Sequence, residues 1–280
     1  MQSKSMSDLA INSSLDWQER GLHYGDGLFE TLLKLNGEIP LWEDHYRRLK
    51  KGCERLHISL ADEKWLAQKV AQETKGQESA IIKIIVTRGR GGRGLLLPAP
   101  DQPSIFVLKY PYRAIKQENL ALDVSICQTR LPINRNLAGI KHLNRLDYVL
   151  AAIEIEGLEN RDEAILCDTD GFIVEGIVSN LFFYLHEAMY TPTLEFCGVE
   201  GIMRQRVLNQ LQHVSIAVEE GRFTPQLLLQ SSECFMCNSV HGVRPIQSIN
   251  QQKFVTGPVT QMLMSELNPA TRPDHRGSVN

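Results

Sequence analysis

A lysine stands between a small, flexible step and an amphipathic helix in the tract from Ala138 to Leu146. Lys141 follows Ala-Gly-Ile, and apolar residues recur after it at helical spacing, at positions 143, 146, 149, 150 and 153. A lysine at such an edge can enter a cavity while its backbone stays fixed. Its amine forms Schiff bases once burial or a neighbouring cation lowers its pKa. The ordinary alternative is a solvated lysine at a helix start.

Three further positions carry groups that could serve the same chemistry. Glu175 ends an apolar run and, if it points into a core, needs a cation or a donor, such as a protonated ring nitrogen. Arg48 adjoins the apolar Leu49 and could present a bidentate fork to a phosphate. Residues 198–204 lead glycines into a predicted helix, whose free amides favour an anion. The plain alternatives are a strand end in water, a charged helix face and an ordinary glycine before a helix.

Cysteine usage argues against a metal site. Six cysteines in a chain of this size do not form a disulfide scaffold, so reduced cytosolic thiols are expected. Cys234 and Cys237 form a C-x-x-C pair, but a redox pair normally lies at a helix N-terminus, whereas residues 233–237 have the character of a buried strand. A zinc site needs a second ligand pair, and none accompanies this one. We expect no metal.

Length and composition are those of a soluble globular protein with one large or two ordinary domains. The chain has 280 residues, of which 42% are hydrophobic and 22% charged, with a formal net charge of -3. This balance gives no reason to expect a nucleic-acid or membrane-surface partner. The apolar runs are too short to cross a bilayer, and residues 1–14 lack the apolar segment of a signal peptide. A cytoplasmic location is expected.

The first 110 residues predict a small α+β unit. Strands are predicted at residues 27–35, 38–41, 80–86 and 104–110, and helices at residues 42–56 and 61–73. Asn36-Gly37 favours the tight turn of a hairpin, and Trp65, Leu66 and Val70 anchor the second helix. The last two strands are continuous apolar runs typical of buried strands. Residues 88–103 are rich in Gly, Arg and Pro and must form a loop, either a mobile insertion or a lid over a site.

The second half predicts a larger α+β unit after a polar linker at residues 111–119. Strands are predicted at residues 120–128, 164–167, 172–175, 180–185 and 235–249, and helices after Lys141, at residues 202–211 and after Thr224-Pro225. Asp170-Gly171 marks a hairpin turn, and Thr224 is a helix N-cap. We therefore predict domains at residues 1–110 and 120–267, with a disordered tail at residues 268–280.

Five tracts, each weak alone, together resemble one family in the right order. Residues 20–31 resemble the N-terminal signature of the fold-type IV pyridoxal-phosphate enzymes. The other matching tracts are His45-x-x-Arg48-Leu49, Lys141, Glu175-Gly176-x-x-Ser179-Asn180-Leu181-Phe182 and Gly201-Ile202-x-Arg204. The resemblance spans residues 20–264, nearly the whole chain. The family includes branched-chain and D-amino-acid aminotransferases and 4-amino-4-deoxychorismate lyase.

The resemblance implies an α+β fold of two domains with pyridoxal 5'-phosphate between them. Lys141 would form the Schiff base, Glu175 would pair with the pyridine nitrogen, and Arg48 would bind the phosphate. The implied phosphate cradle is completed by the Ile202 and Met203 amides with Ser239 and, as an option, Val240. A homodimer is also implied, because relatives complete each site with a loop from the partner subunit.

Within the family, the lyase branch fits best. The tract from Lys141 to Leu146 and the loop at residues 87–94 resemble the lyase forms, and Arg93 falls where relatives bind a substrate carboxylate. Phe29 stands where D-amino-acid aminotransferases carry a tyrosine, and Glu19 stands where the motif more often has Asp. The expected reaction converts 4-amino-4-deoxychorismate to 4-aminobenzoate and pyruvate for folate synthesis. An aminotransferase of the same fold and a non-catalytic binder remain the alternatives.

Overall fold

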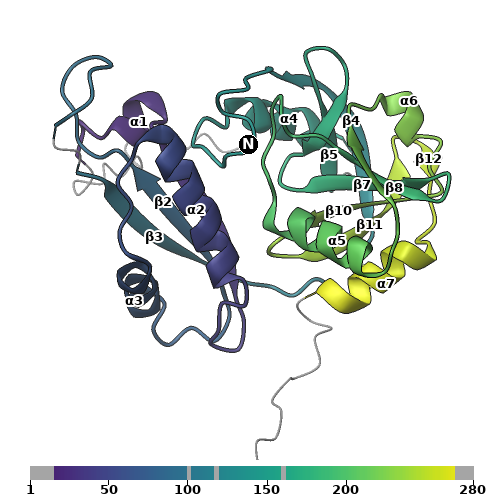
Figure 1. Cartoon of the computed structure of the whole chain (residues 1–280), viewed down its shortest axis with the longest axis horizontal. Coiled ribbons are helices and arrows are strands. Elements are labelled where there is room, and N and C mark those ends of the chain that lie inside the picture. The colour runs from purple at the N-terminus through teal and green to yellow at the C-terminus, as the bar shows by residue number, and fades with distance from the viewer. Residues whose placement is uncertain (1–15, 100–101, 117–119, 159–161, 269–280) are drawn as a thin grey trace, which may run out of the picture.

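The chain folds into two lobes that lie side by side, as the computed structural model shows (Figure 1). The structure describes residues 16–99, 102–116, 120–158 and 162–268. The N-terminal lobe contains α1 (Arg20–Tyr24), β1 (Gly27–Lys34), α2 (Trp42–Leu56), α3 (Glu63–Glu73), β2 (Ala80–Thr87) and β3 (Ser104–Pro111). The division of the chain into domains at residues 111–119 stays a prediction, although each lobe has its own sheet.

The N-terminal lobe is an antiparallel sheet in the order β1-β2-β3 with one covered face. Side chains alternate across β1 and β2 because successive residues of a strand point to opposite faces. One face packs against α2 and α3 in a core that includes Leu28, Leu32, Leu49, Leu66, Val70, Ile82, Ile84 and Val86. The other face carries Phe29, Thr31 and Lys83, with Thr31 paired in register to Lys83. This second face forms a wall of the cavity described below.

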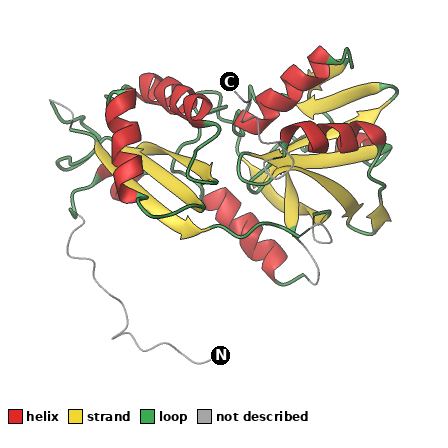
Figure 2. Ribbon diagram, turned by 90° about the horizontal axis from the view of Figure 1, so that it is seen from below, coloured by secondary structure: helices red, strands yellow, loops and turns green. Residues whose placement is uncertain are grey.

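The C-terminal lobe is built on a larger mixed sheet in the order β6-β5-β4-β11-β10-β7-β8-β9, with β12 paired to β11. Figure 2 shows the strands of the two lobes in yellow and the helices that pack on them in red. Its strands are β4 (Leu122–Leu131), β5 (Glu163–Asp168), β6 (Ile173–Gly176), β7 (Asn180–Leu185), β8 (Ala188–Pro192), β9 (Val218–Gly221), β10 (Glu233–Asn238), β11 (Gly242–Ile249) and β12 (Gln252–Lys253). Its helices are α4 (Leu146–Glu156), α5 (Ile202–His213), α6 (Pro225–Leu228) and α7 (Pro258–Leu267).

The larger sheet is covered on both faces at β10, so side chains on both sides of this strand are buried. Along β10, Cys234 and Met236 pack into one core, while Phe235 and Cys237 pack into the other beneath α5 and α7. The Phe235 ring stacks on Phe182 with centroids 5.1 Å apart. Burial on both faces explains why the strand run around the cysteine pair shows no polar alternation.

Most predicted elements are confirmed. The helix at residues 42–56 has the predicted bounds, and the hairpin around Asp170-Gly171 forms between β5 and β6. Thr224 caps α6 by accepting a hydrogen bond from the Leu227 amide. Residues 88–99, 102 and 103 lie outside the helices and strands, as predicted for a loop. No helix in the described part of the chain is both long enough and apolar enough to cross a membrane.

Four local predictions are wrong. Residues 38–41 do not form a strand: after the Asn36-Gly37 turn a single bridge joins Leu35 to Glu38, and α2 begins at Trp42. The predicted strand at residues 235–249 is a hairpin, because β10 and β11 are separated by residues 239–241. β3 is an edge strand and is only partly buried. Trp65 is 48% exposed, so α3 is anchored by Leu66 and Val70.

The predicted disordered tail at residues 268–280 is wrong at its first residue, and several elements of the structure were not predicted. Asn268, the first residue of the predicted disordered tail, is buried and exchanges two hydrogen bonds with the backbone of Val243. Residues 269–280 lie outside the described residues. The helix α7 was not predicted, and neither were the short strands β8 and β9 nor the helix α1.

The apolar face of α4 lies on the surface of the chain, which is the largest departure from the sequence-based expectation. Leu146, Val149, Leu150 and Ile153 are 69%, 49%, 48% and 59% exposed. The residues that dock α4 on the lobe are Ala151, Tyr148 and Ile155. The helical period was therefore right, but the predicted apolar face does not anchor the helix within one chain.

Candidate active site

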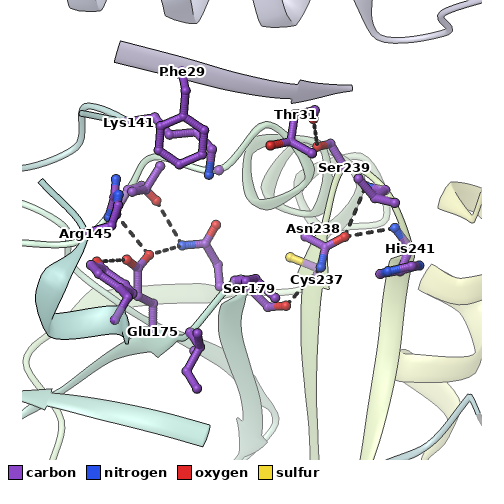
Figure 3. Close-up of a pocket in the computed structure, with 18 of the residues that line it drawn as sticks. Phe29, Thr31, Lys141, Arg145, Glu175, Ser179, Cys237, Asn238, Ser239 and His241 are labelled. Carbon is purple, nitrogen blue, oxygen red and sulfur yellow. Dashed lines mark hydrogen bonds between the residues drawn. The ribbon is translucent and has the colours of Figure 1, made fainter. Parts of the chain in front are cut away.

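A cavity of about 730 Å³ lies between the two lobes. The exposed face of the β1–β2 pair forms one wall, and the ends of β6, β7 and β10 with α4 and the start of α5 form the other (Figure 3). Of the residues predicted from sequence, it is lined by Lys141, Arg48, Glu175, Ile202, Ser239 and Val240. The structure thus brings together residues from five separate tracts of the chain.

Backbone hydrogen bonds to both lobes fix the segment that carries Lys141. The Lys141 carbonyl accepts from the Phe29 amide at 3.0 Å, and the Gly139 amide donates to Gly198 at 2.9 Å. Gly139 has φ +82°, a conformation that side chains disfavour, and a Cβ there would lie 3.3 Å from Glu200. The Ala-Gly step therefore permits a turn that directs Lys141 into the cavity, with Nζ 4.5 Å from the Phe29 ring centroid.

The electrostatic setting of Lys141 favours the neutral amine. Burial and the nearby charges of Arg48 and Arg145 lower the pKa of Lys141 to about 7, against the opposing effect of Glu30 and Glu175. At this pKa a large fraction of the amine is unprotonated near neutrality. The unprotonated amine is the form that attacks a carbonyl and accepts a proton.

Glu175 is a buried carboxylate held by three donors. Its Oε1 accepts from the Tyr148 hydroxyl at 2.5 Å, and its Oε2 accepts from Asn180 Nδ2 and the Val199 amide, both at 3.0 Å (Figure 3). Burial raises the pKa of Glu175, while these donors and nearby cations oppose the rise. Since each carboxylate oxygen has two lone pairs, Oε1 can still accept from a group inside the cavity.

Arg48 is part of a buried ion-pair network on the N-terminal lobe. Its Nε and Nη2 donate to the two oxygens of Glu30 at 2.8 and 2.5 Å, and His45 Nδ1 lies 2.6 Å from the same carboxylate. Burial alone would raise the pKa of Glu30, but Arg48 and His45 lower it to about 2. Arg48 Nη1 also donates to the Glu200 carbonyl. The fork of Arg48 is thus engaged by Glu30, and one N–H on each terminal nitrogen remains for an anion.

The start of α5 and the turn after β10 both line the cavity. Gly201 is the N-cap of α5 and has no side-chain cap, so the first-turn amides, which include Ile202 and Met203, lack helical partners. Ser239 donates from its hydroxyl to the Thr31 carbonyl. The Val240 amide donates to the Asn238 side chain at 3.1 Å and is therefore already engaged. Met203 is buried and lines a small neighbouring cavity.

Arg93 does not line the cavity of its own chain. It is exposed in the loop after Arg88, close to the exposed Leu95 and Leu96. Its assignment to a substrate carboxylate stays a prediction. Cys234 and Cys237 are buried free thiols in β10, and the described residues contain no group of three or more His, Cys, Asp and Glu side chains suited to a metal.

Several cavity residues were not assigned from the sequence. Tyr148 and Arg145 line the cavity beside Lys141, and Arg145 lies over the Tyr148 ring at 4.6 Å. Arg145 belongs to the tract from Lys141 to Leu146 that resembles the lyase form. The sequence therefore indicated its motif but did not indicate that its side chain lines the cavity. Tyr148 lies on the docked face of α4. The strand alternation of β2 could have placed Lys83 opposite the core, whereas nothing local indicated Glu30.

Comparisons with known proteins agree on one family. The family model for amino-transferase class IV matches residues 27–249. An aminodeoxychorismate lyase from Vibrio harveyi is 34% identical over 89% of this chain and 94% of its own length. A putative branched-chain-amino-acid aminotransferase from Methanocaldococcus jannaschii is 30% identical over 83% of this chain and 81% of its own.

The fold agrees with solved structures of the same family. The crystal structure of 4-amino-4-deoxychorismate lyase from Pseudomonas aeruginosa superposes with a TM-score of 0.85 at 34% identity, covering 90% of this chain and 94% of that one. The two-lobe α+β fold predicted from the resemblance is confirmed. Like its relatives, the protein is an enzyme that depends on pyridoxal phosphate. The chain therefore belongs to the class-IV aminotransferase family.

Proposed function

We propose that this enzyme is a 4-amino-4-deoxychorismate lyase, which forms 4-aminobenzoate and pyruvate on the route to folate. The similarity that carries the proposal is the 34% identity to proteins named as this lyase, over most of both chains. Phe29 on the cavity wall supports it, because it stands where the D-amino-acid aminotransferases carry a tyrosine. The same cavity contains Lys141, Glu175 and Arg48, which the reaction requires.

The residues of the cavity fit pyridoxal phosphate. Lys141 offers a neutral amine, and Glu175 offers a free lone pair at the opposite wall for the pyridine nitrogen. Arg48, which donates to the Glu200 carbonyl just before α5, would bind the phosphate together with the first amides of α5 and Ser239. A Cβ on Gly201 would collide with Asn180 Oδ1, so only glycine permits this approach of α5 to the cavity.

Lys141 and Glu175 divide the proposed chemistry between them. Pyridoxal phosphate, when bound, would supply an electron-accepting ring. Lys141 would be the base that takes the proton from the amine-bearing carbon of the substrate. Glu175 would hold the ring nitrogen of the cofactor, and Tyr148 and Asn180 keep its carboxylate in place. Cleavage of the C–O bond to the enolpyruvyl group would release enolpyruvate, which takes up a proton to become pyruvate, and the remaining ring becomes aromatic, which makes the reaction effectively irreversible.

The exposed apolar surface supports a homodimer. The exposed face of α4 includes Val149 and Ile153, which also line the cavity. The loop residues Leu95 and Leu96 are 75% and 86% exposed. Apolar surface of this extent on one chain is typical of a protein interface, and a second copy would cover it. Sedimentation that gives a monomer at micromolar concentration would contradict the dimer.

The free and buried cysteines support a cytoplasmic location. All six are unpaired in the structure, as a reducing compartment allows. Recovery of the native protein from a membrane or secreted fraction would contradict this location.

The decisive experiment is a direct lyase assay with 4-amino-4-deoxychorismate. Purified enzyme with pyridoxal phosphate is expected to release pyruvate. The pyruvate is measured with lactate dehydrogenase, through the loss of NADH absorbance. An aminotransferase is the second candidate, because a relative named in this way is 30% identical. Consumption of a branched-chain amino acid or D-alanine with 2-oxoglutarate, without pyruvate from aminodeoxychorismate, would favour the aminotransferase and reject the lyase.

A further inference from the structure

Glu163 is a buried carboxylate that has no part in the chemistry described above. It begins β5, and its Oε1 accepts from the Val178 amide at 3.0 Å while its Oε2 accepts from the Ser179 hydroxyl at 2.9 Å. Residues 177–179 join β6 to β7 and line the cavity, whereas Glu163 is not among the described residues that line it. A Cβ on Gly176 would collide with Glu163 Oε1, so this segment lies directly on the carboxylate. Glu163 can therefore influence the cavity through the residues that it holds.

A chain of hydrogen bonds leads from Glu163 to the turn after β10. The Ser179 hydroxyl, which donates to Glu163, accepts from Asn238 Nδ2 at 3.1 Å (Figure 3). Asn238 Oδ1 in turn accepts from the backbone amides of Val240 and His241 at 3.1 and 2.8 Å. Because two backbone amides bind the oxygen of Asn238, its nitrogen must face Ser179. The chain thus runs from the core of the C-terminal lobe to the backbone of residues 239–241.

The turn at residues 239–241 is the part of the cavity wall that this chain holds. All three residues line the cavity. Ser239, the first of them, is one of the groups assigned above to the cofactor phosphate, and its hydroxyl donates to the Thr31 carbonyl of the other lobe at 3.1 Å. A shift of this turn would therefore displace Ser239 relative to the start of α5 and weaken the binding of a phosphate.

The direction of the chain requires an ionised carboxylate at its end. Asn238 donates to Ser179 and Ser179 donates to Glu163, so the last group must accept. An amide in place of the carboxylate offers one acceptor atom to two donors, and it would lose either the Val178 amide or the Ser179 hydroxyl. A proton on the oxygen that faces Ser179 turns that acceptor into a donor in the same way. Because Ser179 is buried, a hydroxyl proton without an acceptor is costly there.

The surroundings of Glu163 place its ionisation near neutrality. Burial raises the pKa of Glu163 to about 7, against the opposing effect of the Val178 amide, the Ser179 hydroxyl and the charge of Arg244 on β11. Glu175 on β6 adds to the rise. The nearby Cys237 thiol of β10 is neutral, because burial raises its pKa. The carboxylate that the chain requires is therefore present above about pH 7 and is lost as the pH falls through this value.

We propose that Glu163 is a positioning residue for the cofactor: through Ser179 and Asn238, its carboxylate holds the turn at residues 239–241 in the form that binds the phosphate. The inference rests on the phosphate contacts proposed above for this turn, and it is independent of the reaction that the enzyme catalyses. Loss of the carboxylate, by substitution or by protonation, breaks the chain at its end. The turn then loses its support, although none of its own residues has changed.

The test measures the affinity of the cofactor-free protein for pyridoxamine 5'-phosphate by calorimetric titration. This amine does not form a Schiff base with Lys141, so its affinity depends on the non-covalent contacts alone. At pH 8, Glu163→Gln and Ser179→Ala are each expected to bind about tenfold more weakly than the wild type, the effect of one hydrogen bond to a charged group. The double variant is expected to bind no more weakly than the weaker single variant, because both changes break the same chain.

The pH dependence separates positioning from a merely structural role. At pH 6 the wild type has itself lost most of its Glu163 carboxylate, so its advantage over Glu163→Gln is expected to fall to about twofold. Titration of the ligand phosphate and of Lys141 affects both proteins alike and cancels in this ratio. A glutamate that only stabilises the fold would give the same ratio at both pH values.

Glu233→Gln is the matched control. Glu233 is also a buried glutamate of the C-terminal lobe, and its Oε2 accepts from the amide and the hydroxyl of Thr260 at 2.8 and 2.7 Å. Neither Glu233 nor Thr260 is among the described residues that line the cavity. This variant loses contacts of the same kind and is expected to have a lower melting temperature, but its affinity for pyridoxamine 5'-phosphate should equal that of the wild type at both pH values.

Several outcomes would overturn the proposal. It is wrong if Glu163→Gln and Ser179→Ala keep the wild-type affinity at pH 8, or if their effects add in the double variant. It is also wrong if the ratio of wild-type to variant affinity is the same at both pH values, or if Glu233→Gln weakens binding as much. Where Glu163→Gln does not fold, Ser179→Ala carries the test, since the same change of ratio with pH is expected for it. No step of the test measures pyruvate, so failure of the lyase proposal leaves its result unaffected.

Discussion

The two arginines of the cavity differ in how their charge is balanced. Arg48 is locked to the buried Glu30 by two hydrogen bonds, and His45 supports the same carboxylate. Arg145 has no carboxylate within ion-pair distance among the described residues, and its Nη2 lacks a partner. The cation on the N-terminal lobe is therefore positioned by the protein itself. Arg145, in contrast, can donate to a ligand, and its charge lowers the pKa of Lys141.

This difference suggests a division of labour within the cavity. A paired arginine can hold a fixed position for a cofactor phosphate at little electrostatic cost to the empty protein. Both arginines lower the pKa of Lys141, and Arg48 does so more than Arg145, but the effect of Arg48 is opposed by its partner Glu30, which raises that pKa. Four predictions test this comparison.

The largest effect is expected for Lys141→Ala. Turnover is expected to fall by several orders of magnitude, because the nucleophile and the base are lost together. The variant should keep its fold, since the side chain lies over Phe29 in the cavity and not in a packed core. Borohydride reduction followed by peptide mapping is expected to label Lys141 in the wild type alone. Labelling of another lysine, such as Lys83, would contradict the assignment.

The paired arginine is tested by Glu30→Gln. Loss of one member of a buried ion pair is expected to destabilise the protein by about 3–5 kcal/mol, measured by urea unfolding at pH 7. Since the pKa of Glu30 is lowered to about 2, its contribution is complete above the ordinary carboxyl pKa and is lost as the pH falls toward 2. The wild type should lose roughly 3 kcal/mol from this group over that range. Glu54→Gln, an exposed change on α2, the helix that carries Arg48, is the control and should retain the wild-type acid transition.

Residues whose position depends on a short sequence pattern were predicted, whereas residues whose role depends on distant elements were not. Short patterns indicated the glycine before Lys141, the helix that carries Arg48 and the strand that carries Glu175. All three side chains line the cavity. Glu30 was not predicted, because its role depends on α2 crossing β1 and nothing in residues 27–34 indicates an ion pair. The role of Asn180, which bonds both Glu175 and Val199, likewise exists only after β6, β7 and the 198–201 loop meet.

The face of α4 shows a different limit of sequence reasoning. Helical spacing identifies an apolar face but not the partner that covers it. Within one chain, Leu146 and Ile153 are exposed, and the docked residues include Ala151 and Tyr148. The loop that carries Arg93 was predicted from its composition, but this composition does not indicate which groups Arg93 contacts. A pattern in the sequence identifies an apolar face or a basic loop and does not identify what covers or contacts it.

The lowered pKa of Lys141 predicts how the cofactor-free enzyme captures pyridoxal phosphate. With a pKa of about 7, the neutral fraction of the amine rises from about one-tenth at pH 6 to about nine-tenths at pH 8. The rate of covalent capture, followed by stopped-flow absorbance, is expected to rise roughly tenfold over this range and then level off. A rate that keeps rising to pH 10 would show an ordinary lysine pKa and contradict the electrostatic picture.

The smallest expected effect, and the most direct test of the comparison, is that of Arg145→Met. Removal of this charge relieves Lys141, so the midpoint of the capture profile should move upward, by about one unit or less. Because Arg145 has no ion-pair partner among the described residues, the stability of the cofactor-free protein should change by less than about 1 kcal/mol. The contrast with Glu30→Gln in the same urea assay is the deciding observation. A loss of stability as large as that of Glu30→Gln would mean that Arg145 is also a paired, structural cation, and the proposed division between the two arginines would fail.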